Sequence, residues 1–177
     1  SDKLYGNLRS KTKINEKLRP TVLAYDHPDD DSVEAFKNFR ICLRFLMMNA
    51  KNNLVMISSG SPGVGKSFVC ANLATVTAKS GQRVLVVGGD MRRGQLHGSF
   101  GVNPRNGLAE VLTGTIGISD AISTTMVENL HYMPPGEMPL SPSELLTGPA
   151  LSKLTKWLSA VYDIVIFDTP PILAVTD

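Results

Sequence analysis

Gly60-Ser61-Pro62-Gly63-Val64-Gly65-Lys66-Ser67 is the stretch that decides the fold of this chain. A glycine followed after four residues by Gly-Lys-Ser is the spacing of a Walker A loop, which wraps phosphate groups. The glycines permit backbone angles that other residues resist, so successive N–H groups can converge on phosphate oxygens. Lys66 adds a positive charge, and the Ser67 hydroxyl can complete the ligand shell of Mg²⁺. We therefore predict a site for ATP and Mg²⁺, with these contact residues: Gly60, Ser61, Pro62, Gly63, Val64, Gly65, Lys66, Ser67 and Phe68.

The segments around this loop predict an α/β fold. Short apolar runs indicate buried strands, and longer amphipathic runs indicate helices. The expected strands are residues 54–57, 83–87, 130–133 and 164–167, and the expected helices are residues 32–48, 68–79, 108–112, 143–146 and 151–161. Strands that are apolar throughout and alternate with helices call for a parallel sheet with helices on both faces. The fold class is therefore P-loop NTPase-like.

Two acidic residues follow expected strands. Asp168 ends the run 164–167, which is a Walker B pattern, and Asp90 follows the run 83–87 after two glycines. The carboxyl ends of parallel strands meet at one edge of a sheet, where ligands bind. We therefore predict Lys66, Asp90 and Asp168 as catalytic residues, and Ser67, Asp90 and Asp168 as metal ligands.

The first expected helix, residues 32–48, is predicted to begin at a cap made by Asp31. Phe36, Phe39, Leu43, Leu46 and Met47 repeat on one face, which we expect to meet the sheet. Charged side chains at 34, 37, 40 and 44 form an adjoining stripe. From spacing alone, a solvated stripe with internal ion pairs is favoured over a subunit contact.

Composition limits the other function classes. The 177 residues are 42% hydrophobic and 19% charged, which suits one folded domain and excludes a disordered chain. A net charge of +2 without interleaved basic and aromatic residues gives no indication of nucleic acid binding. The spacing of Cys42, Cys70, His27, His97 and His131 predicts buried thiols and surface histidines rather than a metal site. No apolar run is long enough to span a bilayer, so we expect a soluble fragment.

Residues 1–31 are interpreted as a linker that precedes a domain of residues 32–177. The first 20 residues carry six Lys or Arg against two acidic residues and show little hydrophobic periodicity. A solvated tether and a juxtamembrane basic segment attracted to anionic lipid both fit this pattern.

Three segments together resemble the bacterial tyrosine kinases of polysaccharide copolymerases, which are capsular or exopolysaccharide autokinases. The segments are residues 60–67, 84–92 and 164–171, and the likeness extends over about residues 32–177. The resemblance implies an ATP-dependent kinase that phosphorylates a tyrosine-rich tail of a neighbouring subunit in a ring. It also implies attachment, through a transmembrane part, to the cytoplasmic face of the bacterial inner membrane. Because the family joins subunits through Glu, Arg and Arg at three-residue spacing, Glu34, Lys37 and Arg40 become the expected oligomer contact.

The chain departs from the family pattern at two points. Gly88 stands where the family has the first acid of Asp-x-Asp, and a glycine neither binds metal nor accepts a proton, so phosphotransfer is expected to be impaired. The family domain also continues beyond the Walker B strand, so the domain is expected to be incomplete at its C-terminus. Two alternatives stay open: a nucleotide-gated oligomerisation module without phosphotransfer, and a partition-type P-loop ATPase. Ser61 argues against the second, because those ATPases resemble this chain but carry a lysine at that place in the loop.

Overall fold

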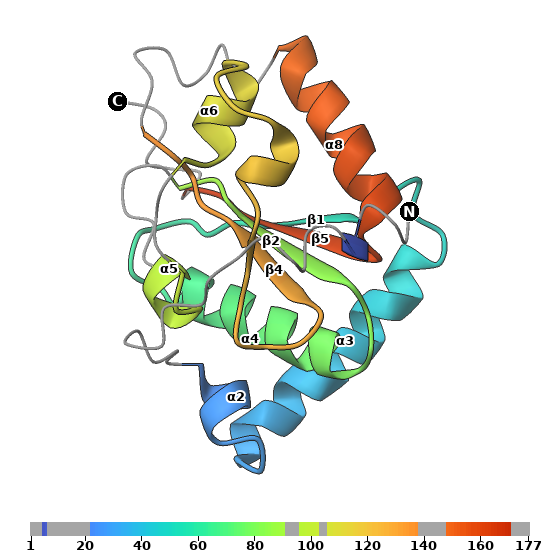
Figure 1. The fold of residues 1–177 in the computed structure, drawn as a ribbon. Helices are drawn as coiled ribbons and strands as arrows, with labels where there is room; N and C mark the ends of the chain where they lie inside the picture. The colour runs from blue at the N-terminus through green and yellow to red at the C-terminus, as the bar shows by residue number, and fades with distance from the viewer. Residues whose placement is uncertain (1–4, 7–21, 91–95, 103–105, 138–147, 171–177) are drawn as a thin grey trace.

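The computed structural model describes residues 5–6, 22–90, 96–102, 106–137 and 148–170. Five strands form one sheet in the order β1-β5-β2-β4-β3 (Figure 1). β1 (Leu54–Ile57), β5 (Ile164–Asp168), β2 (Val84–Gly88) and β4 (Leu130–Met133) are parallel, and β3 (Ser123–Thr124) pairs antiparallel with β4. The predicted fold class is confirmed. The edge strand β3 was not predicted, because two polar residues carry no apolar pattern.

The sheet register brings three strand ends together. Asp168 pairs with Ile57 of β1 on one side and with Gly88 of β2 on the other. The polar residues that follow or end these strands therefore lie at one edge of the sheet. This is the carboxyl-terminal edge, where the sequence predicts the ligand site.

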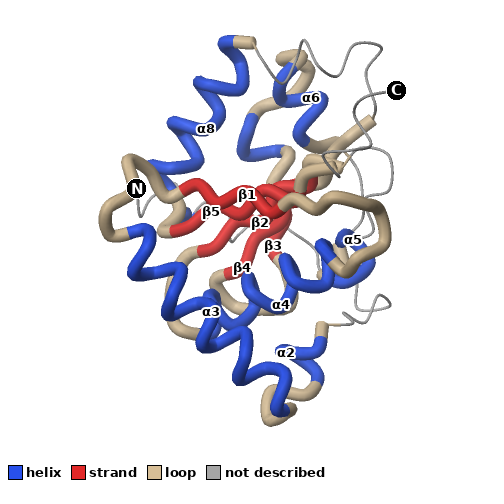
Figure 2. Tube along the Cα trace, turned by 180° about the vertical axis from the view of Figure 1, so that it is seen from behind, coloured by secondary structure: helices blue, strands red, loops and turns tan. Residues whose placement is uncertain are grey.

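Helices cover both faces of the sheet (Figure 2). α4 (Lys66–Lys79), α3 (Asp31–Met47), α2 (Leu23–Asp26) and α5 (Leu96–Ser99) lie on one side. α6 (Leu108–Leu112), the 3-10 helix η1 (Ile118–Asp120) and α8 (Pro149–Val161) lie on the other. Each side has its own apolar core, with Val84, Val86 and Ile166 facing α4 and Leu85, Val87 and Val165 facing α8. The expected helix at 143–146 lies outside the described residues.

α4 forms the centre of the first layer. It begins at Lys66, directly after Gly65, and its residues 70–78 are buried. Asn72 in this helix is fully buried and accepts a hydrogen bond from the Ala24 backbone N–H at 2.8 Å, while its amide donates to the Phe68 carbonyl at 2.9 Å. The α2 segment, which precedes residue 32, is therefore joined to the core.

The prediction for α3 was partly wrong. Its N-cap is Asp30, whose carboxylate accepts from the Ser32 N–H at 2.8 Å, and the helix begins one residue earlier than expected. Phe39 and Leu46 are 44% and 73% exposed. The reason is that α3 packs mainly on α4 rather than on the sheet, so its contact stripe is narrower than the apolar periodicity.

Two further expectations about single residues were wrong. Cys42 is exposed, because it lies on the outer side of α3, whereas Cys70 in α4 is buried as predicted. His131 is buried rather than at the surface, because it lies in β4, which is paired on both sides, and its Nδ1 is 2.8 Å from the Tyr162 hydroxyl oxygen. No helix within the described ranges has the length and apolar character needed to cross a membrane.

Candidate functional site

The Walker A loop connects β1 to α4 at the carboxyl-terminal edge of the sheet. Gly63 and Gly65 have φ angles of +76° and +89°, which L side chains rarely adopt. A Cβ built on either glycine meets no atom within 4 Å, so backbone conformation rather than crowding requires glycine here. The loop residues 60–65 are exposed. The loop thus presents its backbone to solvent at the N-terminal end of α4, where the helix dipole favours an anion.

Lys66, Ser67 and Asp168 form the polar centre of the site. Lys66 Nζ makes an ion pair with Asp168 Oδ1, and Ser67 Oγ donates to Asp168 Oδ2 at 2.9 Å. The side chains of Lys66 and Asp168 are only 8% and 3% exposed. Asp168 is held at the end of β5 by the pairing with β1 and β2, and the other two residues form the first turn of α4. The structure therefore brings three of the predicted site residues together.

These three side chains fit a magnesium-bound nucleotide. Hydroxyl and carboxylate oxygens are the hard ligands that Mg²⁺ prefers, and Mg²⁺ is commonly held by one or two such groups together with phosphates and waters. The described part of the chain contains no group of three or more His, Cys, Asp or Glu that could hold a metal by itself. The donor set therefore suits a metal ion that arrives with phosphate oxygens.

Asp90 lies beside this centre. The backbone N–H groups of Gly89 and Asp90 donate to the Asp168 carbonyl at 2.8 Å and 3.1 Å, so the turn after β2 is fixed against the end of β5. Its predicted roles in catalysis and metal binding stay predictions. The remaining loop residues and Phe68, which is 51% exposed and has its ring 5.9 Å from that of Phe36, also lie at this edge.

Two buried groups below the loop were not identified as site residues from sequence. Cys70 lies one turn into α4, and burial, reinforced by the Asp168 carboxylate and opposed by Lys66, raises its pKa well above the usual value. Tyr132 of β4 is fully buried on the same face, and burial, together with Asp168, raises its pKa as well. Both groups are therefore protonated at neutral pH. A lone tyrosine in an apolar strand gives no sequence signal of proximity to Asp168.

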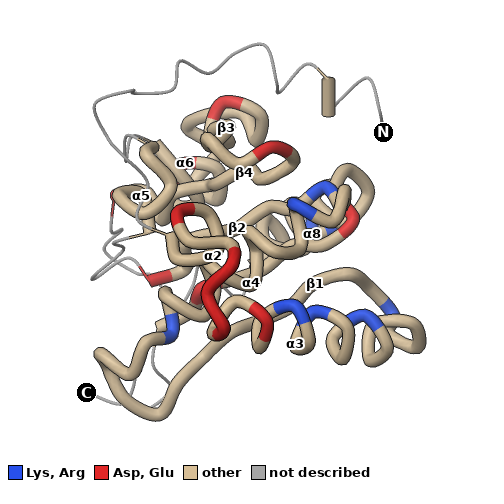
Figure 3. Tube along the Cα trace, turned by 90° about the horizontal axis from the view of Figure 1, so that it is seen from below, with Lys and Arg blue, Asp and Glu red and all other residues tan. Residues whose placement is uncertain are grey.

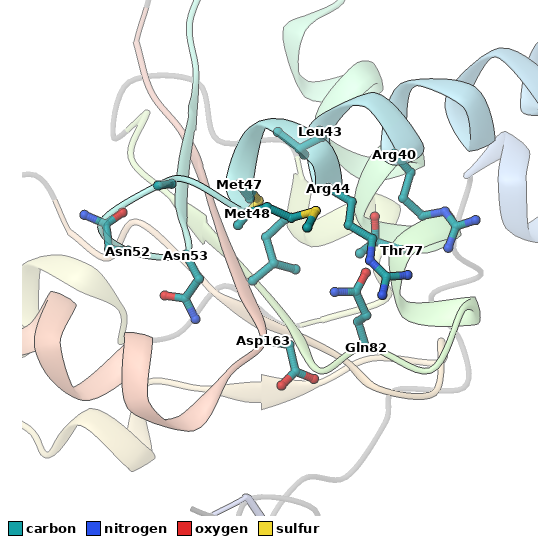
Figure 4. A pocket seen from close by; sticks show the side chains of 12 residues that line it. Arg40, Leu43, Arg44, Met47, Met48, Asn52, Asn53, Thr77, Gln82 and Asp163 are labelled. Carbon is teal, nitrogen blue, oxygen red and sulfur yellow. The ribbon is translucent and has the colours of Figure 1, made fainter.

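The predicted oligomer contact lies on α3, away from this centre. Lys37 Nζ is 3.1 Å from Glu34 Oε2 within the same helix, and both side chains are exposed. Arg40 lines a hollow of about 310 Å³ together with Arg44, Met47, Gln82 and Asp163 (Figure 4). The hollow faces the amino-terminal ends of the strands and does not belong to the phosphate site.

The fold and the loop-centred site define a P-loop nucleotide-binding domain. The chain matches the family described as AAA domain over residues 52–177. It is 44% identical over 156 residues to the tyrosine-protein kinase wzc of Salmonella typhimurium, covering 88% of this chain and 22% of that one. It is similar to the solved BceF tyrosine kinase domain, with a TM-score of 0.81 and 39% identity over 99% of this chain and 69% of that chain. The chain therefore belongs to the AAA-domain family and, within it, to the bacterial tyrosine-protein kinases.

The chain spans only 21% to 23% of the length of curated relatives such as wzc. The fold also occurs in other P-loop proteins: the septum site-determining protein MinD of Pyrococcus horikoshii, solved with Mg-ADP, has a TM-score of 0.58 and 32% identity over 67% of this chain and 49% of that one.

Proposed function

We propose that this chain is an ATP-dependent protein-tyrosine autokinase domain that regulates capsule or exopolysaccharide synthesis and export. The observation that carries the proposal is the cluster of Lys66, Ser67 and Asp168 under the Walker A loop. Membership of the tyrosine-protein kinases supports transfer to tyrosine. In its full context the domain would lie at the cytoplasmic face of the inner membrane, with residues 1–31 as the connection and residues 32–177 as part of the kinase domain. The α2 segment of this connection packs on the core of the domain.

The proposed roles follow from the geometry. Residues 60–68 bind the phosphates of ATP, Ser67 and Asp168 hold Mg²⁺ with help from Asp90, and Lys66 binds the phosphate that is transferred. The metal ion, when bound, neutralises charge on the phosphate oxygens. Lys66 is paired with Asp168 in this structure, so nucleotide binding requires its ammonium group to turn from the carboxylate to the phosphate. The Asp168 carboxylate would then be available to bind Mg²⁺.

The shape and charge of α3 support self-association in a ring. Acidic residues are found at and before its N-terminal end, and basic residues are found along the rest of it (Figure 3). Phe45 and Met48 near its C-terminal end are 67% and 73% exposed. Opposite charges at the two ends suit a head-to-tail contact between copies, and the exposed apolar side chains supply area to bury. Glu34, Lys37 and Arg40 are the proposed contacts, and the tyrosine-rich tail of the neighbouring subunit is the proposed acceptor.

A second candidate is a nucleotide-gated oligomerisation module that does not transfer phosphate. Gly88 favours it, because the position next to Asp168 in the sheet carries no acid. A partition-type ATPase is less favoured, since Ser61 replaces the lysine expected in that class.

The test is transfer of labelled phosphate from Mg-ATP to a separate tyrosine-rich acceptor by the full chain and by Lys66→Met. We expect slow labelling of tyrosine by the wild type and none by the variant. If the wild type binds Mg-ATP and forms oligomers but labels no tyrosine, the kinase proposal fails and the oligomerisation module replaces it. Equal labelling by Lys66→Met would place the activity in a contaminant.

A further inference from the structure

Gly88, the last residue of β2, has no room for a side chain. A Cβ built on it would lie 2.8 Å from Pro135 Cδ and 2.9 Å from the Tyr132 hydroxyl oxygen, both closer than real Cβ contacts. Gly88 is paired in register with Asp168, so this crowded point lies directly beside the polar centre of the site. The space that a side chain at position 88 would enter is therefore taken by Pro135 and by the phenol of Tyr132.

The Tyr132 hydroxyl is a buried polar group. The side chain is 0% exposed, and its oxygen has no hydrogen-bond partner among the described residues. The ring is fixed by packing, with Phe100 at a centroid distance of 5.5 Å. Leaving a buried hydroxyl unpaired is unfavourable, and phenylalanine would fill the same space without that cost. A bound ligand could therefore supply the hydrogen-bond acceptor that the hydroxyl lacks.

Tyr162, which directly follows α8, is a buried tyrosine whose hydroxyl has a partner within the protein. It is 2% exposed, and its hydroxyl oxygen is 2.8 Å from His131 Nδ1 on the α8 face. The two tyrosines are thus matched in burial and differ in face and in partner. The unpaired one is the one beside Asp168.

We propose that Tyr132 is a further binding residue of the phosphate site, whose hydroxyl donates a hydrogen bond to an oxygen of the bound hydrated magnesium–nucleotide. The inference rests on the proposed nucleotide binding and extends it. Tyr132 thereby supplies a neutral hydrogen-bond donor at a point of the site where Gly88 has no side chain. The bond adds affinity and orientation without adding charge next to Asp168.

The test compares Tyr132→Phe with Tyr162→Phe, measuring Mg-ADP affinity by titration calorimetry and thermal unfolding without ligand. Tyr132→Phe should weaken Mg-ADP binding about 3- to 10-fold, the range for one lost hydrogen bond, and leave the unfolding temperature unchanged or higher. Tyr162→Phe should lower the unfolding temperature, because it removes the hydrogen bond between the Tyr162 hydroxyl and His131 Nδ1, and should keep wild-type affinity. Wild-type affinity in Tyr132→Phe overturns the proposal and makes the hydroxyl a packing spacer. If the wild type itself does not bind Mg-ADP, nucleotide binding fails first and this inference fails with it.

The geometry at position 88 has its own test. Gly88→Ala should lower the unfolding temperature, and part of that loss should return in Gly88→Ala combined with Tyr132→Phe, because the 2.9 Å contact with the oxygen is removed. Gly98→Ala is the matched control, since a Cβ there meets nothing within 4 Å and its φ is not positive. Equal losses for Gly88→Ala in both backgrounds would show that the Tyr132 oxygen does not occupy this space.

Discussion

Polar side chains at the two ends of the parallel strands differ in their partners. At the amino-terminal end, the side chain of Asn53 donates to the carbonyls of Ser159 and Tyr162, and Asp163 is bound by Arg83. At the carboxyl-terminal end, Lys66 and Asp168 are buried against each other, and the Tyr132 hydroxyl is unpaired among the described residues.

The difference separates stability from ligand binding. The hydrogen bonds of Asn53 and Asp163 at the amino-terminal end join β1, β2 and β5 to one another and to α8. At the carboxyl-terminal end, a bound nucleotide can change the pairing, because its phosphate offers Lys66 an anionic partner other than Asp168. Substitutions at the first end should therefore change stability alone, and substitutions at the second should change stability and nucleotide affinity together.

The largest effect is expected for Lys66→Met. It removes one partner of a buried ion pair. The Asp168 carboxylate, which is 3% exposed, keeps the Ser67 hydroxyl as its side-chain donor among the described residues. Breaking a buried pair in this way costs about 3 kcal/mol of unfolding free energy. Urea denaturation without nucleotide measures it, and calorimetry should show that Mg-ADP binding is lost as well.

Asp168→Asn provides the control for this prediction. Once the carboxylate is removed, Lys66→Met no longer strands a buried charge, so its cost in the Asp168→Asn background should fall below about 1 kcal/mol. The same cost in both backgrounds would contradict the ion pair as the source of the effect.

A smaller effect, confined to stability, is expected for Asn53→Ala. The Asn53 amide donates to the carbonyl of Ser159 at 3.1 Å and to that of Tyr162 at 2.7 Å, and so satisfies backbone groups at the C-terminal end of α8. Their loss should cost about 2 kcal/mol in urea denaturation, with Mg-ADP affinity unchanged. Asn52→Ala is the matched control, because the Asn52 side chain is exposed and accepts a hydrogen bond from the Leu54 N–H two residues away. If Asn53→Ala lowered the Mg-ADP affinity and Asn52→Ala did not, the two ends of the strands would not separate stability from nucleotide binding.

Much of this arrangement could be predicted from sequence because it is encoded locally. The apolar strands and the loop that ends in Lys66 and Ser67 are continuous patterns, and Asp168 follows directly from the end of a strand. The rest depends on contacts across the fold. The burial of His131 depends on Tyr162, the edge strand β3 is defined only by its pairing with β4, and the relation between Gly88 and Tyr132 exists only where two neighbouring strands meet. The apolar periodicity of a single segment does not show which residues of different segments will be in contact.

The smallest effect, at the amino-terminal end, should depend on pH. Burial alone would raise the pKa of Asp163, but the side-chain and backbone N–H groups of Arg83 outweigh it, so the pKa lies below the usual 3.8. A carboxyl group whose pKa is lowered on folding stabilises the fold above its unfolded pKa, and this contribution is lost as the pH falls through the folded pKa. Because the Asp163 side chain is 38% exposed, Asp163→Asn should cost only about 0.5 kcal/mol at pH 7. Denaturation at pH 7 and near pH 3 should show the gap between wild type and variant closing on acidification, while Mg-ADP affinity at pH 7 stays equal in both. A gap that persists in acid would mean that Asp163 acts through its shape rather than its charge.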